Sequence, residues 1–230
     1  MKKVAIILAR GGSKRIPNKN IKPFLDRPII SYSIKAAINS QLFDEVIVST
    51  DCEKIKKVSE SYGAKVPFLR SSINSNDNAT TVDALFEVLD FYKSKNKIFH
   101  FATCIYACAP FITSHLLIKS YEILKTNNSD SVFPVIAYSH PIQRALKIID
   151  KNKITVVDEL KSNTRTQDLI SSYYDSGMFY SFDINKLYKN KNLRTNNSHC
   201  IEIDELHGQD IDNTNDWALA ELKYKLMTNE

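Results

Sequence analysis

Short apolar runs and amphipathic stretches alternate along the first half of the chain. The apolar runs predict strands at residues 4–8, 45–50, 66–70 and 98–106. Apolar positions at helical spacing predict helices over residues 28–38, 53–62, 82–92 and 114–125. Strands that alternate with helices in this way typically form a parallel sheet with helices packed on its faces. The pattern therefore predicts an α/β fold with a mostly parallel sheet.

The helix predicted over residues 82–92 has the most regular spacing. Thr80 followed by Asp83 resembles a capping box and predicts where this helix begins. The small, polar stretch at residues 71–79 precedes it. A loop of this length in a compact domain is either an ordinary surface loop or a functional one, because long irregular loops often carry binding residues.

Beyond Ser129 the alternation is interrupted and then returns. Strands are predicted near residues 131–138, 145–149 and 155–157, with polar turns between them. We interpret residues from about 138 to 172 as an excursion from the main sheet that forms a dimerisation arm. The core pattern resumes with a strand at 177–182, a helix starting near Asp183, a strand at 200–203 and a helix at 217–226. A length of 230 residues suits one domain spanning residues 1–230.

Composition narrows the functional classes. The four cysteines include no C-x-x-C pair, so a zinc site or a disulfide framework is not indicated. The apolar run at residues 4–9 is too short to cross a membrane and has no signal-peptide cleavage region after it, so we expect a cytoplasmic protein. The net charge of +5 suits a small polyanionic substrate. We expect no nucleic-acid partner, because no nucleic-acid-binding module is recognisable.

A basic, glycine-containing loop follows the first predicted strand. Gly11 and Gly12 permit backbone conformations that bring amide N–H groups together around an anion. Positive charge surrounds them at Arg10, Lys14, Arg15 and Lys19. The loop matches neither the Walker A pattern nor the three-glycine dinucleotide fingerprint. It predicts a phosphate site; the alternative is a solvated surface turn.

A pair of carboxylates lies near the other end of the chain. In extended backbone, Asp210 and Asp212 face the same side, roughly 7 Å apart. Mg²⁺ commonly binds one or two carboxylates together with substrate phosphates, so a phosphate loop and a D-x-D sequence in one chain favour a magnesium site. The alternative is that Asp212 caps the final helix and Asp210 is a surface acid.

Several motifs together resemble the CMP-sialic acid (acylneuraminate) cytidylyltransferase family. They are residues 9–14 with 16–20, residues 48–51 and residues 209–212, in an order and spacing that extend over nearly the whole chain. Within that family, residues 66–70, 140–146, 165–169 and 174–177 most resemble the pseudaminic acid cytidylyltransferases. The resemblance implies a three-layer, Rossmann-like fold of the nucleotide-diphospho-sugar transferase type, and a homodimer. The implied reaction joins CMP from CTP to the anomeric hydroxyl of a nonulosonic acid and releases pyrophosphate.

The resemblance also assigns roles to residues. It implies nucleotide binding by Leu8, Ala9, Arg10, Ser13, Lys14, Lys19, Asn20, Arg70, Ala79, Thr81 and Tyr106. Catalytic roles fall to Arg10, Lys14 and Asp210, and Mg²⁺ binding falls to Asp210 and Asp212. The candidates for the sugar are Gln143, Arg144, Arg165, Tyr174 and Ser176. Arg144 and Arg165 suit the sugar carboxylate, because a guanidinium matches a carboxylate through two parallel hydrogen bonds.

The sequence departs from the sialic acid branch on the acceptor side. Gln143 stands where that branch commonly carries Lys, and residues 106–110 lack its glutamine. These departures argue against ordinary sialic acid and favour pseudaminic acid. The alternatives are the same chemistry on legionaminic, N-acetylneuraminic or 3-deoxy-octulosonic acid, or a nucleotide-binding regulatory protein without activity.

Overall fold

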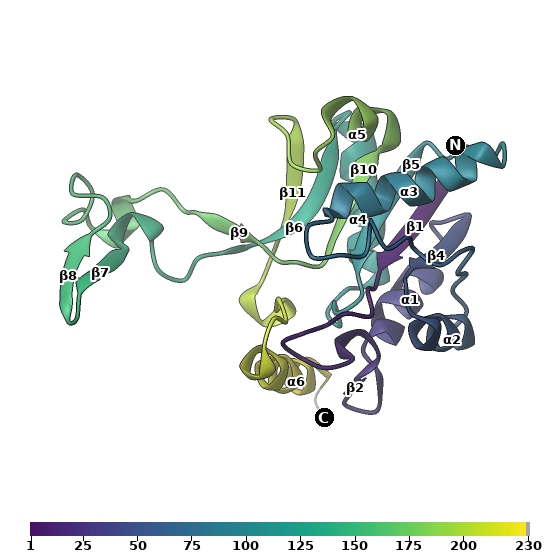
Figure 1. The fold of residues 1–230 in the computed structure, drawn as a ribbon. Helices are drawn as coiled ribbons and strands as arrows, with labels where there is room; N and C mark the ends of the chain where they lie inside the picture. The colour runs from purple at the N-terminus through teal and green to yellow at the C-terminus, as the bar shows by residue number, and fades with distance from the viewer. Residues whose placement is uncertain (229–230) are drawn as a thin grey trace.

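A seven-stranded sheet forms the centre of the molecule, and the computed structural model describes residues 1–228 (Figure 1). The strand order is β11-β6-β10-β5-β1-β4, and β9 pairs with β6. The strands are β1 (Lys3–Leu8), β4 (Glu45–Ser49), β5 (Phe101–Tyr106), β6 (Ser131–Ala137), β9 (Tyr173–Asp175), β10 (Phe179–Asp183) and β11 (Ser198–Ile203). β1 is parallel to β4 and β5, and β11 is parallel to β6, whereas β10 is antiparallel to both of its neighbours. The prediction of a mostly parallel sheet is confirmed.

Helices cover both faces of the sheet because alternate residues of its strands point to opposite sides. Ala5 and Ile7 of β1 belong to one buried cluster, and Val4 and Ile6 belong to the other. The first cluster includes residues of α1 (Ile30–Asn39), α2 (Glu53–Ser61), α4 (Ser114–Thr126) and α6 (Thr214–Thr228). The second includes residues of α3 (Thr81–Ser94) and α5 (Ile184–Asn190). The result is the three-layer arrangement implied by the family resemblance.

Most predicted elements occur where the periodicity places them. The capping box is present, since the Thr80 hydroxyl accepts from the Asp83 N–H and the Asp83 carboxylate accepts from the Thr80 N–H. The strand predicted at residues 66–70 was wrong. This segment is extended but makes only isolated bridges to the β4 region, and Pro67 has no N–H to donate to a ladder. The strand predicted from residue 98 begins at Phe101 instead.

The topology creates a crevice at the carboxyl end of β1. β1 lies between β4 and β5, so the chain passes from β1 to β4 on one side and then crosses over to β5 on the other side. Loops at such a switch point diverge, and in open α/β sheets ligands bind in the crevice between them. The basic loop at residues 9–20 starts at this point, and the short turn η1 (Lys19–Ile21) and the hairpin of β2 (Pro23–Phe24) and β3 (Arg27–Pro28) follow it.

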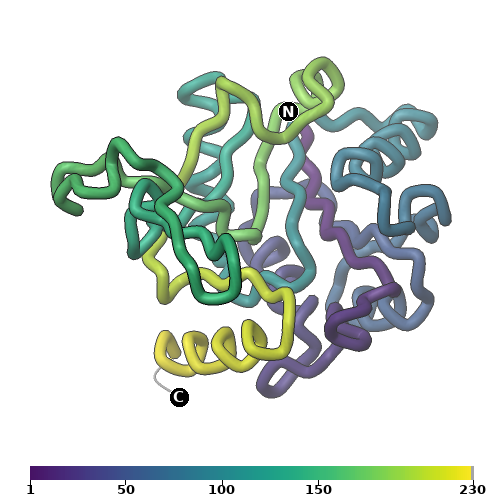
Figure 2. Tube along the Cα trace, turned by 60° about the vertical axis from the view of Figure 1, so that its left-hand side comes forward, coloured from purple at the N-terminus to yellow at the C-terminus, as the bar shows by residue number. Residues whose placement is uncertain are grey.

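Residues 138–172 leave the body of the molecule as an arm (Figure 1). The arm contains a two-stranded hairpin, β7 (Leu146–Asp150) and β8 (Lys153–Val156), and the short turns η2 (Ile142–Arg144) and η3 (Thr166–Asp168). Figure 2 shows the arm standing out from the side of the molecule, with the C-terminal helix below it. The short turn η4 (Glu205–His207) precedes that helix. No helix within residues 1–228 is long and apolar enough to cross a membrane.

Candidate active site

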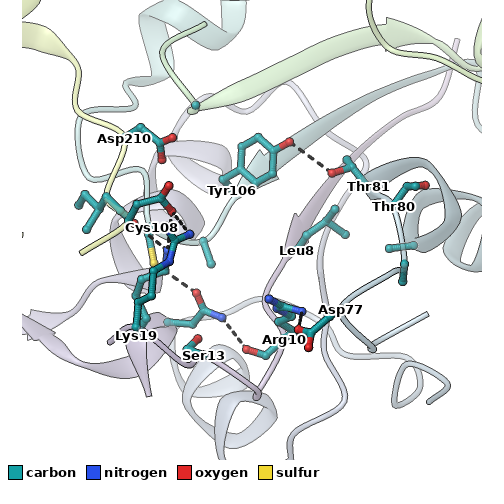
Figure 3. Close-up of a pocket in the computed structure, with 18 of the residues that line it drawn as sticks. Leu8, Arg10, Ser13, Lys19, Asp77, Thr80, Thr81, Tyr106, Cys108 and Asp210 are labelled. Atoms are coloured by element: carbon teal, nitrogen blue, oxygen red, sulfur yellow. Dashed lines mark hydrogen bonds and ion pairs between the residues drawn. The ribbon is translucent and has the colours of Figure 1, made fainter. Parts of the chain in front are cut away.

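A cavity of about 560 Å³ lies at the carboxyl end of β1 (Figure 3). Its walls come from the basic loop, the polar segment before α3, the end of β5, the start of β10 and the residues just before α6. Twelve predicted site residues line it: Leu8, Arg10, Ser13, Lys14, Lys19, Asn20, Arg70, Ala79, Thr81, Tyr106, Asp210 and Asp212. Folding therefore brings the basic loop and the D-x-D sequence into one cavity.

Ion pairs connect the basic loop to the opposite walls. Arg10 and Lys14 both contact the carboxylate of Asp77, at 2.9 and 2.5 Å. Arg15 pairs with Asp212 at 2.8 Å, and the Lys19 Nζ donates to the Ile211 carbonyl oxygen at 2.7 Å. The cations of the loop thus converge on one space, and acidic groups hold them there.

Gly11 does not act as predicted. Among the glycines of residues 1–228, positive φ angles occur at Gly63 and Gly177. The Gly11 N–H donates to the Asp51 carboxylate at 2.7 Å, so it is already used within the protein. A side chain at Gly11 would place a Cβ 2.9 Å from the Cβ of Cys52. Gly11 is needed for this close approach, and the charge for binding an anion comes from side chains.

Asn20 holds the loop from inside. Its amide nitrogen donates to the Arg10 carbonyl oxygen at 2.8 Å, and the Cys108 thiol donates to its amide oxygen at 3.2 Å. Burial raises the pKa of Cys108 to about 12, so this thiol stays protonated and able to donate. Ala9 is fully buried, with its N–H donating to the Ser49 carbonyl oxygen, and does not line the cavity.

Arg70 and Tyr106 form another wall. The Arg70 Nε donates to the Ser49 hydroxyl at 2.9 Å, and its guanidinium also bonds the Ser49 carbonyl oxygen. Burial lowers the pKa of Arg70. The hydroxyls of Tyr106 and Thr81 lie 3.3 Å apart, and burial raises the pKa of Tyr106 to about 12 (Figure 3). This wall presents neutral hydroxyls and one fixed cation.

The D-x-D sequence lies in the same cavity and contacts the loop through Arg15 and Lys19. Partial desolvation and the charge of Asp212 raise the pKa of Asp210. Gly177 makes room for Asp210, because a Cβ there would lie 3.0 Å from the Asp210 Cγ. Asp212 does not cap α6: the Asn213 side chain accepts the N–H groups of Asn215 and Asp216. The Asp212 carboxylate is therefore not used as a helix cap, and it pairs with Arg15 at the cavity wall instead.

The residues predicted to bind the sugar are not in this cavity. Gln143 and Arg144 lie in the arm, where they donate to the Ile170 carbonyl oxygen at 3.0 Å and to the Thr166 hydroxyl at 3.2 Å. Arg165, beside Thr166, immediately precedes η3 in the same part of the arm. The arm thus gathers these three residues with one another, and none of them lines the cavity of their own chain.

The other two sugar candidates lie at the base of the arm. Tyr174 packs against Tyr138 with ring centroids 5.0 Å apart. Ser176 is buried, and its hydroxyl has no hydrogen-bond partner in the part of the chain that the structure describes. Neither residue lines the cavity, although Asp175 and Gly177 beside them do.

Sequence reasoning gave no role to several residues that line the cavity, among them Asp77, Asp175 and Arg194. Asp77 lies in the polar stretch that was predicted to be either an ordinary or a functional loop. Asp175 belongs to the segment at residues 174–177 that carried the family resemblance, which is a signal that could have found it. Arg194 follows α5 and has no sequence pattern that distinguishes it from other surface cations.

Comparisons with known proteins agree with this geometry. The chain is 38% identical over 227 residues to the pseudaminic acid cytidylyltransferase of Campylobacter jejuni subsp. jejuni serotype O:23/36 (strain 81-176), covering 98% of this chain and 97% of that protein. It is 28% identical to the CMP-N,N'-diacetyllegionaminic acid synthase of Legionella pneumophila, over 96% of this chain and 95% of that one. A solved structure of CMP:2-keto-3-deoxy-manno-octonic acid synthetase complexed with CTP has a TM-score of 0.72, with 15% identity and full coverage of both chains. A sequence model described as cytidylyltransferase matches residues 4–223. The chain belongs to the cytidylyltransferase family.

Proposed function

We propose that this protein transfers CMP from CTP to the anomeric hydroxyl of pseudaminic acid, giving CMP-pseudaminic acid and pyrophosphate. The proposal is based on one observation: the basic loop and the two carboxylates, Asp210 and Asp212, line the same cavity. Such a cavity suits a polyphosphate bound with a divalent cation. The full-length similarity to a pseudaminic acid cytidylyltransferase supports the choice of sugar.

The chemistry is an in-line displacement at phosphorus. The anomeric oxygen of the sugar acid forms a bond to the α-phosphorus while the bond from that phosphorus to the pyrophosphate oxygen breaks. Arg10, Lys14 and Lys19 neutralise the charge of the triphosphate and of the leaving pyrophosphate. Among the predicted catalytic residues, Asp210 is the candidate to accept the proton of the attacking hydroxyl.

We assign the nucleoside of CTP to the wall formed by the ends of β1 and β5, Arg70 and the start of α3. This wall contains Leu8, Arg70, Ala79, Thr81 and Tyr106. Arg70 is buried and bonded to Ser49, so its guanidinium is in place before a ligand binds. A neutral wall of hydroxyls beside one fixed guanidinium suits a ribose and a base with hydrogen-bond acceptors.

Asp210 and Asp212 would hold Mg²⁺. Their donor set fits this ion, because both supply hard carboxylate oxygens. Within residues 1–228 there is no group of three His, Cys, Asp or Glu side chains that could hold a metal by themselves. Substrate phosphates and water would therefore complete the coordination, as Mg²⁺ commonly allows. When bound, the ion would neutralise phosphoryl charge.

We further propose a homodimer in the cytoplasm. The arm exposes many apolar side chains, including Leu146, Ile148 and Ile154. Exposed apolar surface of this kind marks a contact with another protein. Since Gln143, Arg144 and Arg165 lie in the arm, they would act on the sugar only in the cavity of a second copy.

The function is tested by incubating the purified chain with CTP, Mg²⁺ and pseudaminic acid and measuring released pyrophosphate. We expect release that requires all three components, and a slower rate with legionaminic, N-acetylneuraminic or 3-deoxy-octulosonic acid. If none of these acids supports release, the proposed activity is wrong. Binding of CTP without consumption would instead indicate a regulatory protein.

A further inference from the structure

The charges lining the cavity are divided between two regions. Cations gather at the basic loop, where Arg10, Lys14 and Lys19 lie. The wall formed by the β9–β10 segment and the residues after α5 is different, because it combines the carboxylate of Asp175 with the guanidinium of Arg194. Neither residue has a role in the function proposed above.

Asp175 is held firmly in this wall. One carboxylate oxygen accepts the Gly177 N–H at 2.9 Å, and the other accepts the Tyr180 hydroxyl. Gly177 adopts a left-handed conformation with φ of +69°, which favours glycine and forms the break between β9 and β10. An ionised carboxylate has about four lone-pair sites, so it can accept further hydrogen bonds from a ligand.

A fixed carboxylate is unfavourable next to phosphates. In a cavity that binds a triphosphate, an acid that neither holds a metal nor pairs with the cations of the basic loop, as Asp77 does, fits best beside a part of the substrates that presents hydrogen-bond donors. The triphosphate has few donors, whereas a sugar acid has several hydroxyls. Asp175 therefore marks the side of the cavity that receives the acceptor.

Arg194 complements this acid. Arg194 is exposed and lines the cavity. Its guanidinium makes no hydrogen bond to any of the described residues, 1–228. It lies near enough to Asp175 to lower the pKa of that carboxyl, although burial has the larger, opposite effect and raises it. A guanidinium without a partner in a substrate cavity suits a carboxylate, which it can bind through two parallel hydrogen bonds.

We propose that Asp175 and Arg194 determine the specificity for the acceptor: Arg194 binds the carboxylate of the sugar acid, and Asp175 accepts a hydrogen bond from one of its hydroxyl or amide groups. This inference rests on the proposed function and makes it more specific. It places the recognition of the sugar carboxylate within the same chain that binds CTP, not only in the arm.

The test is steady-state kinetics of the full chain with the two substrates varied separately. Arg194→Ala should raise the KM for pseudaminic acid about tenfold or more, as expected for the loss of a charge-assisted pair. The KM for CTP should stay within about twofold, because the proposal assigns Arg194 to the acceptor and not to CTP. Arg194→Lys should raise the KM for pseudaminic acid less than Arg194→Ala, because lysine keeps the positive charge but lacks the two parallel N–H donors of the guanidinium.

Asp175→Asn should also raise the KM for pseudaminic acid, with the KM for CTP unchanged. Lys189→Ala is the matched control: Lys189 is an exposed cation of α5 that does not line the cavity, and its loss should change neither KM. Normal CTP binding by each variant shows that it is folded. The inference is wrong if wild-type protein turns over but Arg194→Ala leaves both KM values unchanged or raises that for CTP equally. Absence of turnover by the wild type would instead overturn the proposed function.

Discussion

The carboxylate of Asp77 lies where an anion would be expected between Arg10 and Lys14. It contacts both cations, and these contacts lower the pKa of the Asp77 carboxyl. All three side chains are exposed, so water can replace each contact at little cost. Asp77 therefore acts as an internal counter-ion of Arg10 and Lys14, and if the basic loop binds CTP as we propose, the phosphates must displace it.

Asp77→Asn should tighten CTP binding. Removing the competing charge leaves Arg10 and Lys14 free for phosphate, and we expect an affinity gain of about two- to fivefold, as befits exposed ion pairs. Isothermal titration with CTP and with CMP measures this. CMP lacks the β- and γ-phosphates and should gain less. Glu122→Gln, an exposed acid of α4, serves as control. Weaker binding by Asp77→Asn would show that Asp77 assists the nucleotide.

The site residues that could be predicted are those whose functional partners stand only a few positions away in the sequence. Lys14 was found because basic residues cluster in one short loop, and Asp210 because a second carboxylate stands two positions away. Arg194 was not found, because only the path of the chain from α5 to β11 brings it to the cavity. The contact of Gly11 with Cys52 was missed for the same reason, since it depends on the distance between two loops.

At the scale of the elements, Glu45 connects β4 to the helix layer. Its buried carboxylate accepts hydrogen bonds from Tyr92 of α3 at 2.5 Å, from Lys65 at 3.0 Å and from Lys97. Burial alone would raise the pKa of Glu45, but the hydrogen bonds from Lys97, Tyr92 and Lys65 outweigh it and lower that pKa to about 2.

Glu45→Gln should destabilise the fold in a pH-dependent way. A depressed pKa in the folded state contributes stability that is present above the unfolded value near 4.5 and is lost as the pH falls toward 2. Because Lys65 is largely exposed, we expect a difference on the order of 2 kcal/mol in the free energy of unfolding at pH 7. Urea denaturation at pH 7, 5, 4 and 3 should show this difference shrinking below about pH 4.5. Glu60→Gln, an exposed acid of α2, should show no such trend. A constant difference across this range would rule out the ionised contact.

Periodicity located the elements but not their interruptions. Val82, Leu85 and Leu89 define α3 from local spacing alone, and Thr80 marks its start. The sequence predicted a strand at residues 177–182 but no strand at β9, so it could not show the break between β9 and β10, and β10 begins at Phe179 instead. In the structure, Ser176 donates its N–H to the Pro134 carbonyl oxygen, and pairing with β6 resumes in another register. That break is what carries Asp175 and Gly177 to the cavity.

At the scale of the whole molecule, the arm has an apolar face that its own chain leaves uncovered. Leu146 pairs with Val156 and Ile148 with Ile154 across the hairpin, so these four side chains lie on one face. Ile148 is 75% exposed and Ile154 is 57% exposed. The interruption of the helix–strand alternation predicted an excursion here. Sequence alone could not show that the arm projects from the body, because projection depends on the absence of long-range contacts between the two.

Replacing Ile148 and Ile154 together by Asp should convert a dimer into monomers. Two buried charges facing a partner without counter-ions would cost far more than the apolar contact they replace. Light scattering after gel filtration measures the mass, and the monomer should stay folded, because both side chains are exposed within one chain. Ile98→Asp, at a 63% exposed position on the body, is the matched control and should leave the mass unchanged. A double variant that stays dimeric would show that another surface joins the copies.

If the variant is monomeric, its KM for pseudaminic acid should rise more than its KM for CTP, because the cavity would lose Gln143, Arg144 and Arg165 of the second copy while keeping the basic loop of its own.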